Sequence, residues 1–172
     1  MNKDNLRRFA QYNIWATQRL CECLKAVSDA DFNQDIGLYF KSIAGTVNHL
    51  LLGEHYLWYS RFKENHSPTM ALNTVIHQDK TQLLNELSHK SLNWLSFIDD
   101  LDETVLTGNL NYFRSNGEAQ SLPYADTLIH VFNHGTHHRG QVTAAMTILG
   151  YQCPELDWVY MLVEKNLKDC PE

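Results

Sequence analysis

The stretch that decides the fold spans residues 123–150 and reads PYADTLIHVFNHGTHHRGQVTAAMTILG. Pro123 suits the first turn of a helix, where its missing N–H is not needed, and Gly150 suits the position just after a helix ends. The two residues therefore predict a long helix between them. His134 and His138 are four residues apart in this helix, so their imidazoles lie on one face, about one turn apart.

Apolar residues at three- and four-residue steps predict further helices on both sides of this stretch. We expect one over residues 4–26, one over residues 42–63, and a short last helix over residues 155–167. A third long helix, which carries apolar residues as far as Ile98, is predicted to start after an N-cap at Asn73 or Thr74. No repeat and no linker divides the chain.

The period of the pattern changes between residues 105 and 122. Leu110 and Tyr112 precede Asn116-Gly117, which is the favoured pair for a two-residue turn between antiparallel strands. The sequence therefore predicts an all-α protein: a four-helix bundle with a small β-hairpin before the fourth helix and a short C-terminal helix. We expect residues 1–172 to form a single domain, and bundles of this kind build metal and cofactor sites from facing helices.

The composition excludes several classes of protein. A formal net charge of −6 argues against a nucleic-acid binder, which would need a basic surface, and the apolar segments are too interrupted to span a membrane. The N-terminus lacks the apolar core of a secretion signal. We expect a cytoplasmic protein whose four cysteines, Cys21, Cys23, Cys153 and Cys170, are free thiols.

A metal ion held by His134 and His138 needs a third ligand from another helix. His49 lies at the edge of the apolar face of the helix predicted over residues 42–63. A single inward histidine is more often a hydrogen-bonded core residue than a ligand. Gly45 and Gly53 lie one turn before and one turn after it, however, which suggests open space beside the imidazole. Three converging imidazoles without an acidic partner would be costly unless something is bound.

Other polar residues are candidates for supporting roles. We expect His130 to contact the ligands without binding the metal, or to lie at the surface, rather than to be a fourth ligand. We expect His55 and His137 to face solvent or to pack against other residues. Gln141 could orient an imidazole or join two helices. Asn13 could support the ligands, although a buried structural hydrogen bond is the more common role. No general base is evident, because Glu54 points away from the face of His49.

Three motifs together resemble the DinB/YfiT family of metal-dependent proteins. They are YNIWA at residues 12–16, TVNHLLLGEHYLWYSRF at residues 46–62 and NHGTHHRGQ at residues 133–141. The resemblance covers nearly the whole chain, and its most specific element is the H-x-x-x-H-R-G-Q string. It implies a four-helix bundle that binds a divalent ion, nickel or zinc, through His49, His134 and His138. The spacing of the residues points to the same three histidines.

The chemistry of such a site limits the possible classes of function, but it identifies neither a catalytic residue nor a substrate. Three neutral imidazoles leave coordination positions open, as in catalytic rather than structural sites, and an acidified water or a thiolate could occupy them. Imidazoles suit zinc, nickel, copper and iron alike. The resemblance implies enzymes that use low-molecular-weight thiols, so we expect a metal-dependent enzyme of thiol-transferase type. The alternatives are a metal-dependent hydrolase and a non-catalytic metal-binding stress-response protein.

The resemblance also implies a homodimer. Aromatic residues crowd two segments, and adjacent helical positions differ by about 100° in direction, so we expect some of these side chains to reach the surface and form an interface through helix faces. Burial of the same rings under the hairpin or the last helix is the alternative. The residues concerned are Tyr12, Trp15, Tyr56, Trp58, Tyr59 and Phe62.

Overall fold

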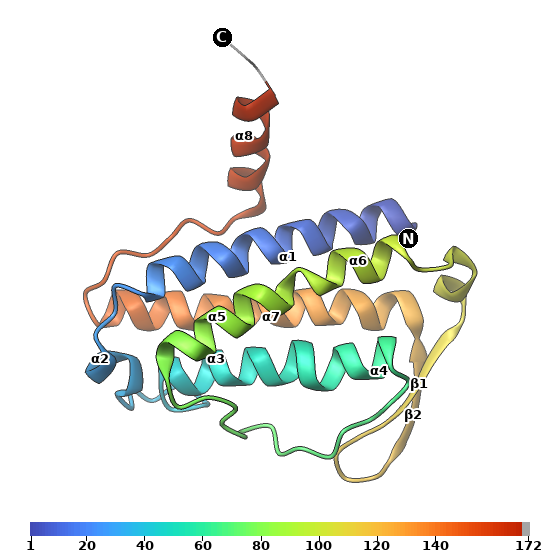
Figure 1. Ribbon diagram of the computed structural model, residues 1–172, viewed down its shortest axis with the longest axis horizontal. Coiled ribbons are helices and arrows are strands. Elements are labelled where there is room, and N and C mark those ends of the chain that lie inside the picture. The colour runs from blue at the N-terminus through green and yellow to red at the C-terminus, as the bar shows by residue number, and fades with distance from the viewer. Residues whose placement is uncertain (170–172) are drawn as a thin grey trace.

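The structure, a computed structural model, describes residues 1–169 and shows the predicted bundle (Figure 1). Four long helical segments lie side by side, and a two-stranded hairpin lies at one end of them. The predicted all-α four-helix fold is therefore confirmed. The four segments are α1 (Lys3–Leu24), the continuous run of α3 (Ile43–Leu51), η1 (Leu52–Trp58) and α4 (Tyr59–Lys63), the pair α5 (Lys80–Ser91) and α6 (Asn93–Asp99), and α7 (Tyr124–Ile148).

Both ends of α7 lie where the sequence predicts them. The helix begins directly after Pro123. At the other end Gly150, at φ +82°, donates its N–H to the Thr147 carbonyl at 3.1 Å, and Tyr151 donates to Met146 at 2.9 Å. This pair of bonds is the Schellman arrangement, which requires a residue that tolerates positive φ. The glycine therefore ends the helix and turns the chain back across the bundle.

The second long helix contains a segment that the pattern did not predict. Its bounds match the expected 42–63, but η1 is a π-helix of seven residues, in which N–H groups bond five residues back instead of four. The wider turn places Gly53 against His134 of α7. It also places the buried Glu54 side chain against α1, where Asn13 donates to it. Segments of this kind are frequent at functional sites.

The third helix starts later than predicted. Its N-cap is Asp79, whose side chain accepts from the N–H of Gln82 at 2.7 Å, rather than Asn73 or Thr74. The reason is Asn48 of α3, whose Oδ1 accepts from the N–H groups of Ile76 and His77 at 2.8 and 3.0 Å. These bonds hold the segment before Asp79 as a loop against α3 and compete with helix formation.

The hairpin is present with a longer turn than predicted. Strands β1 (Asn109–Phe113) and β2 (Ala119–Pro123) are antiparallel, with Leu110 opposite Leu122. Arg114 donates its N–H to the Glu118 carbonyl at 2.8 Å, so residues 115–117 form a three-residue loop in which Gly117 has φ +86°. The two-residue turn was therefore wrong, because the glycine occupies the left-handed position that closes a three-residue loop.

Three shorter helices complete the chain. Helices α2 (Asp29–Asn33) and η2 (Glu103–Thr107) were not predicted, since they are too short to show a period. The last helix, α8 (Trp158–Asp169), starts three residues later than predicted and projects from the bundle (Figure 1). Its delayed start is explained by Tyr12, whose hydroxyl donates to the Leu156 carbonyl at 2.8 Å and holds the preceding segment extended along α1.

The interior has two apolar ends separated by polar residues. Leu20, Leu24, Ile43, Val47, Leu83 and Val142 belong to one buried cluster, and Leu6, Phe62, Trp94, Leu128 and Phe132 belong to another. On α1 the residues between the two clusters are Asn13 and Thr17, both buried. On α7 they include His134, Gly135, His138 and Arg139. The two apolar ends fix the helices, and the layer between them carries the polar groups.

The clustered aromatic rings pack against other elements but are not all buried. Tyr12 stacks on Trp158 of α8 with ring centroids 5.1 Å apart, and Trp58 meets Tyr112 of the hairpin at 5.3 Å. Tyr12 and Phe62 are buried, whereas Trp15, Tyr56, Trp58 and Tyr59 are half-buried, so packing under the hairpin and the last helix accounts for part of the aromatic surface and the interface stays a prediction. The homodimer itself stays a prediction, which sedimentation equilibrium would test.

Two further expectations concern the whole chain. Within residues 1–169, no helix combines the length and the apolar character needed to cross a membrane. Cys21, Cys23 and Cys153 are free thiols, as predicted, whereas Cys170 lies outside the described residues. Burial raises the pKa of the Cys21 thiol to about 12, so this thiol is inert at neutral pH.

Candidate metal centre

Helices α3 and α7 bring the three predicted ligands together. The Nε2 atom of His134 lies 3.2 Å from Nε2 of His49 and 3.0 Å from Nε2 of His138. His49 and His138 are buried, and His134 is half-buried. Four ligands at the zinc–nitrogen distance of roughly 2.0–2.1 Å in a tetrahedron would lie about 3.3 Å apart, close to the separations found here.

The outer nitrogens of two of these rings determine where their protons are. His49 donates from Nδ1 to the Leu72 carbonyl at 2.9 Å, and His138 donates from Nδ1 to Oε1 of Gln141 at 2.7 Å. Since both acceptors are oxygens that can only accept, the inward Nε2 atoms of these neutral rings carry lone pairs. Of the three Nε2 atoms, only that of His134 can carry a proton. The other two lone pairs therefore compete for at most one N–H donor. A cation fits this arrangement.

The pKa shifts agree with neutral rings. Burial, reinforced by the neighbouring His138 and His49, lowers the pKa of His134 to about 3. Burial lowers the pKa of His138 to about 4, although its bond to Gln141 opposes the shift, and burial also lowers the pKa of His49. Metal binding needs deprotonated imidazoles, so the fold prepares the three rings for it at neutral pH.

The packing around His49 differs from the expected open space. The ring of Phe40 stacks on the imidazole with centroids 3.9 Å apart. Gly45 makes this possible, because a Cβ there would clash with the Phe40 carbonyl. Gly53 lies against Cε1 of His134. Gly45 therefore lets Phe40 approach His49, whereas a Cβ at Gly53 would make only an ordinary van der Waals contact with His134. The open space expected at both glycines is filled on the Gly45 side by Phe40.

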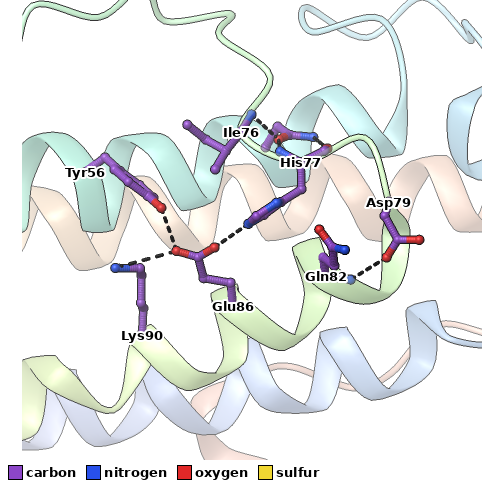
Figure 2. Close-up of polar contacts among 8 residues, drawn as sticks. Tyr56, Ile76, His77, Asp79, Gln82, Glu86 and Lys90 are labelled. Atoms are coloured by element: carbon purple, nitrogen blue, oxygen red, sulfur yellow. Dashed lines mark hydrogen bonds and ion pairs between the residues drawn. The ribbon is translucent and has the colours of Figure 1, made fainter.

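The carbonyl that orients His49 belongs to Leu72, in the loop before α5. Figure 2 shows the bonds that hold Ile76 and His77, in the later part of this loop. Asn48, which neighbours His49 on α3, holds residues 76 and 77 through three hydrogen bonds. On the other side, His77 and Tyr56 both bond the carboxylate of Glu86, and Lys90 lies 3.6 Å from it. The loop following Leu72 is thus fixed to α3 and α5, which steadies the carbonyl that His49 contacts.

The remaining histidines take separate positions. His130 lies against Trp58, and its ring centroid is 5.7 Å from that of His134, so it borders the cluster without joining it. His137 is exposed beside His138. His55 is buried, and burial lowers its pKa to about 3, so it is a packing residue. These placements agree with the roles expected for the three residues.

A second polar cluster, which we call the inner cluster, lies on the α1 side of the same helices. Asn13 donates to Glu54 Oε2 at 2.9 Å and accepts from Arg139 Nη1 at 2.6 Å, and Arg139 also donates to Thr17 at 3.2 Å. Gly135 allows this approach, because a Cβ there would clash with Glu54. Asn13 therefore has the structural role and does not contact the histidines, whereas Gln141 does orient one of them.

Glu54 and Arg139 are fully buried, and each affects the ionisation of the other. Burial raises the pKa of Glu54, and the charge of Arg139 and the Asn13 hydrogen bond oppose that rise. Burial lowers the pKa of Arg139, and Glu54 opposes this. The sequence did not single out Arg139, yet a signal was present: Gly135 and Arg139 follow His134 and His138 by one position and repeat their four-residue spacing on the next face.

The histidines open into a cavity of about 570 Å³, which we call the histidine cavity. Its walls come from the end of α3, η1, α4, α7, the hairpin and the loops at residues 39–40 and 72. Among the described residues that line it there is no aspartate and no glutamate. The residues that matter below are the three converging histidines, Phe40, Trp58, Arg61, Tyr112, Arg114, His130 and Gln141.

This fold and this site define a class of protein: helical bundles in which histidines from two facing helices converge at the wall of a cavity. The three-histidine cluster fits metal binding. The model of the DinB family matches residues 1–166, and the chain therefore belongs to the DinB family.

Two proteins of Bacillus subtilis show how far the likeness extends. The protein named DinB, from strain 168, is 27% identical over 168 residues, which cover 92% of this chain and 94% of that protein. The solved structure of YfiT, described as a probable metal-dependent hydrolase with an unusual four-helix bundle topology, matches with a TM-score of 0.68. That match covers 88% of this chain and 91% of YfiT at 15% identity, so it shows a shared fold.

Proposed function

We propose that this protein is a metal-dependent enzyme that binds one divalent ion, nickel or zinc, through His49, His134 and His138. The observation that carries the proposal is the convergence of three Nε2 atoms, with those of His49 and His138 at 3.2 and 3.0 Å from that of His134, and with the lone pairs of these two directed inward by bonds at Nδ1. Outer partners such as the Leu72 carbonyl and Gln141 fix the tautomer and orientation of metal-binding histidines.

The reaction we propose is transfer of a low-molecular-weight thiol to an electrophile. A divalent ion with open positions lowers the pKa of a thiol and holds the thiolate. In the transfer a sulfur–carbon bond forms, the leaving group departs with its electron pair, and the thiol proton goes to solvent. The absence of carboxylates among the described residues of the histidine cavity supports this reaction, because it needs no general base from the protein.

A second candidate is hydrolysis. The observation that favours it is the fold shared with YfiT, which is described as a probable metal-dependent hydrolase. Fold alone does not determine activity, and hydrolysis would have to proceed without a carboxylate base in the cavity. A protein that binds metal without turnover, as in a stress response, is the third outcome that an experiment can identify.

The test begins with protein purified without a histidine tag. Metal content is measured by mass spectrometry, and zinc and nickel are added back to metal-free protein. The loaded protein is then assayed for conjugation of L-cysteine to chlorodinitrobenzene and for cleavage of p-nitroanilides. Conjugation that needs the metal and is lost in His134→Ala but kept in His137→Ala supports the proposal. Cleavage alone would favour a hydrolase, and tight binding with neither activity would favour the non-catalytic alternative.

A further inference from the structure

Arg61 on α4 is a buried cation in the wall of the histidine cavity. Its side chain is 8% exposed. The guanidinium carbon lies 4.6 Å from the ring centroid of Trp58 and 4.6 Å from that of Tyr112, and the two centroids are 5.3 Å apart, so both rings lie toward one side of the planar group. The rings therefore do not enclose the guanidinium, and its N–H groups are left for a hydrogen-bonding partner.

The edge of this guanidinium is largely unused. Nη2 of Arg61 makes one long contact with the Phe113 carbonyl, at 3.4 Å, and Nε has no hydrogen-bond partner within residues 1–169. No carboxylate of the described chain lies within ion-pair distance of it. Arg7, Arg19 and Arg114, which are more exposed, each pair with a carboxylate. A buried charge without a partner is costly, so the fold retains here a cation that a bound anion would stabilise.

The surroundings of Arg61 favour an anion from outside the chain. The described lining of the histidine cavity includes no acidic residue, and the second arginine in it, Arg114, lies on the hairpin and pairs with Glu118 at 3.0 Å. An ion at the three histidines would add two further positive charges to the same cavity. The overall charge of the protein is negative, so this positive interior is a local property of the cavity.

We propose that Arg61 binds a carboxylate at one end of the substrate while the other end reaches the three histidines. The inference rests on the proposed function and specifies its substrate: a small, elongated molecule with a metal-binding group, such as a thiol, at one end and a carboxylate at the other. A carboxylate matches the unpaired guanidinium edge because both groups are planar and can form paired hydrogen bonds. We take the substrate to be elongated because Arg61 and His134 line one cavity and are linked by a chain of contacts through the rings of Trp58 and His130.

Calorimetric titration with two matched thiols tests the proposal. The probes are 6-mercaptohexanoate and 6-mercaptohexanol, which differ in the carboxylate, and each is added to zinc-loaded and to metal-free protein. Zinc-loaded wild-type protein should bind the carboxylate probe about tenfold or more tightly than the alcohol, as expected for a charge-assisted hydrogen bond. Arg61→Gln should remove that preference and leave zinc content unchanged, whereas Arg114→Gln, at the hairpin, should keep it.

A second measurement covers the case in which Arg61→Gln does not fold. In wild-type protein with assigned arginine side chains, the Nε–H signal of Arg61 should shift when the carboxylate probe is added and stay in place with the alcohol. Equal affinity for the two probes, a preference that survives Arg61→Gln, or an unchanged Arg61 signal would overturn the inference. If the histidines bind no metal but metal-free protein still prefers the carboxylate probe through Arg61, the proposed function fails and the anion site stands.

Discussion

The histidine cluster and the inner cluster occupy the same layer of the bundle but differ in how their groups are matched. The same segments of chain build both: His134 and His138 face the cavity, and Gly135 and Arg139, one position later, face α1. In the inner cluster Asn13 joins a carboxylate to a guanidinium, so unlike groups meet. In the histidine cluster three groups of one kind meet beside a cavity.

This difference indicates that one cluster has a structural role and the other a binding role, although both lie in the same layer of the bundle. Buried groups of opposite charge that a third group joins stabilise a particular packing, whereas unmatched groups that line a cavity can be matched by a ligand. Glu54 Oε1 and Arg139 Nε also have no hydrogen-bond partner among the described residues, but they do not line the histidine cavity. The inner cluster therefore fixes α1 against α7 and η1, and the histidine cluster and Arg61 are the places where something can bind. The predictions below either break one cluster without the other or measure how far the two are independent.

The largest effect should be the loss of metal on removal of one imidazole. His134→Ala should reduce metal content from about one equivalent to none after purification, because an ion that loses one of its three protein ligands binds too weakly to be retained. Elemental analysis of protein purified without a histidine tag measures this. His137→Ala, which removes an exposed ring next to His138, should keep full metal content. A His134→Ala protein with an intact equivalent of metal would refute the three-histidine site.

The next largest effect should be on stability, in the inner cluster. Arg139→Met should lower the free energy of unfolding by about 3–5 kcal/mol, because Glu54 would remain buried without its partner. Urea unfolding of metal-free protein measures this change. Adding Glu54→Gln to the same chain should recover part of the loss, since the remaining charge is then removed. A change below about 1 kcal/mol would mean that the pair is not the stabilising element of this layer.

A smaller effect, on metal affinity, is expected at Gln141, which accepts a hydrogen bond from His138. Gln141→Leu keeps the three ligands but removes the acceptor from Nδ1 of His138, so metal affinity should fall by about 10–100-fold, the usual range for such supporting residues. Competition with a chelator measures the affinity, and Gln141→Glu, which keeps an acceptor, should retain most of it. An unchanged affinity in Gln141→Leu would show that Phe40 and the helix hold His138 without this bond.

The most gradual effect should be the dependence of stability on pH. His134 and His138 have pKa values of about 3 and about 4 in the folded protein, below the usual value of about 6.5. The unfolded chain therefore binds more protons in this window, and the metal-free protein should lose stability as pH falls from about 6.5 toward about 4. Thermal unfolding across this range measures the loss.

A matched control separates the cluster from general acid effects. His134→Asn should flatten the pH profile, and His66→Asn, at an exposed loop histidine, should leave it unchanged. Metal affinity of the folded protein should stay nearly constant down to about pH 4 and decline below it, because protons compete for these nitrogens only near their lowered pKa values. A stability profile that is flat between about pH 7 and 4 would contradict the assigned shifts of the two rings.

The sequence predicted those parts of the molecule that depend on local pattern. Helix periodicity, Pro123 and Gly150 were enough for the bundle, and the four-residue spacing of His134 and His138 with the family resemblance was enough for the cluster. The start of the third helix was missed because Asn48, distant in sequence, captures the N–H groups of the loop before it. Helix propensity depends on neighbouring residues, so it could not predict a hydrogen bond to a residue this far away in the sequence.

The supporting residues were less predictable, for a related reason. Phe40 lies in a loop with no motif, and only the fold brings its ring onto His49. Arg61 was not singled out from the sequence, and its contact with Tyr112 depends on where the fold places the hairpin. Gln141 was accessible to sequence reasoning because it lies within the same helix as its partner. Contacts within one element can be read from spacing, and contacts between elements require the fold.

The π-helix at residues 52–58 has a consequence for how this protein can vary. It lies between the part of the segment that carries His49 and the part that carries Arg61, and Trp58 is its last residue. Deletion of a single residue there would give a regular helix, but would rotate everything after it by about 100° relative to His49. The ion-binding and carboxylate-binding ends of the cavity would then no longer face each other. We therefore expect the length of this segment to tolerate no insertion or deletion, even where its side chains can be exchanged freely.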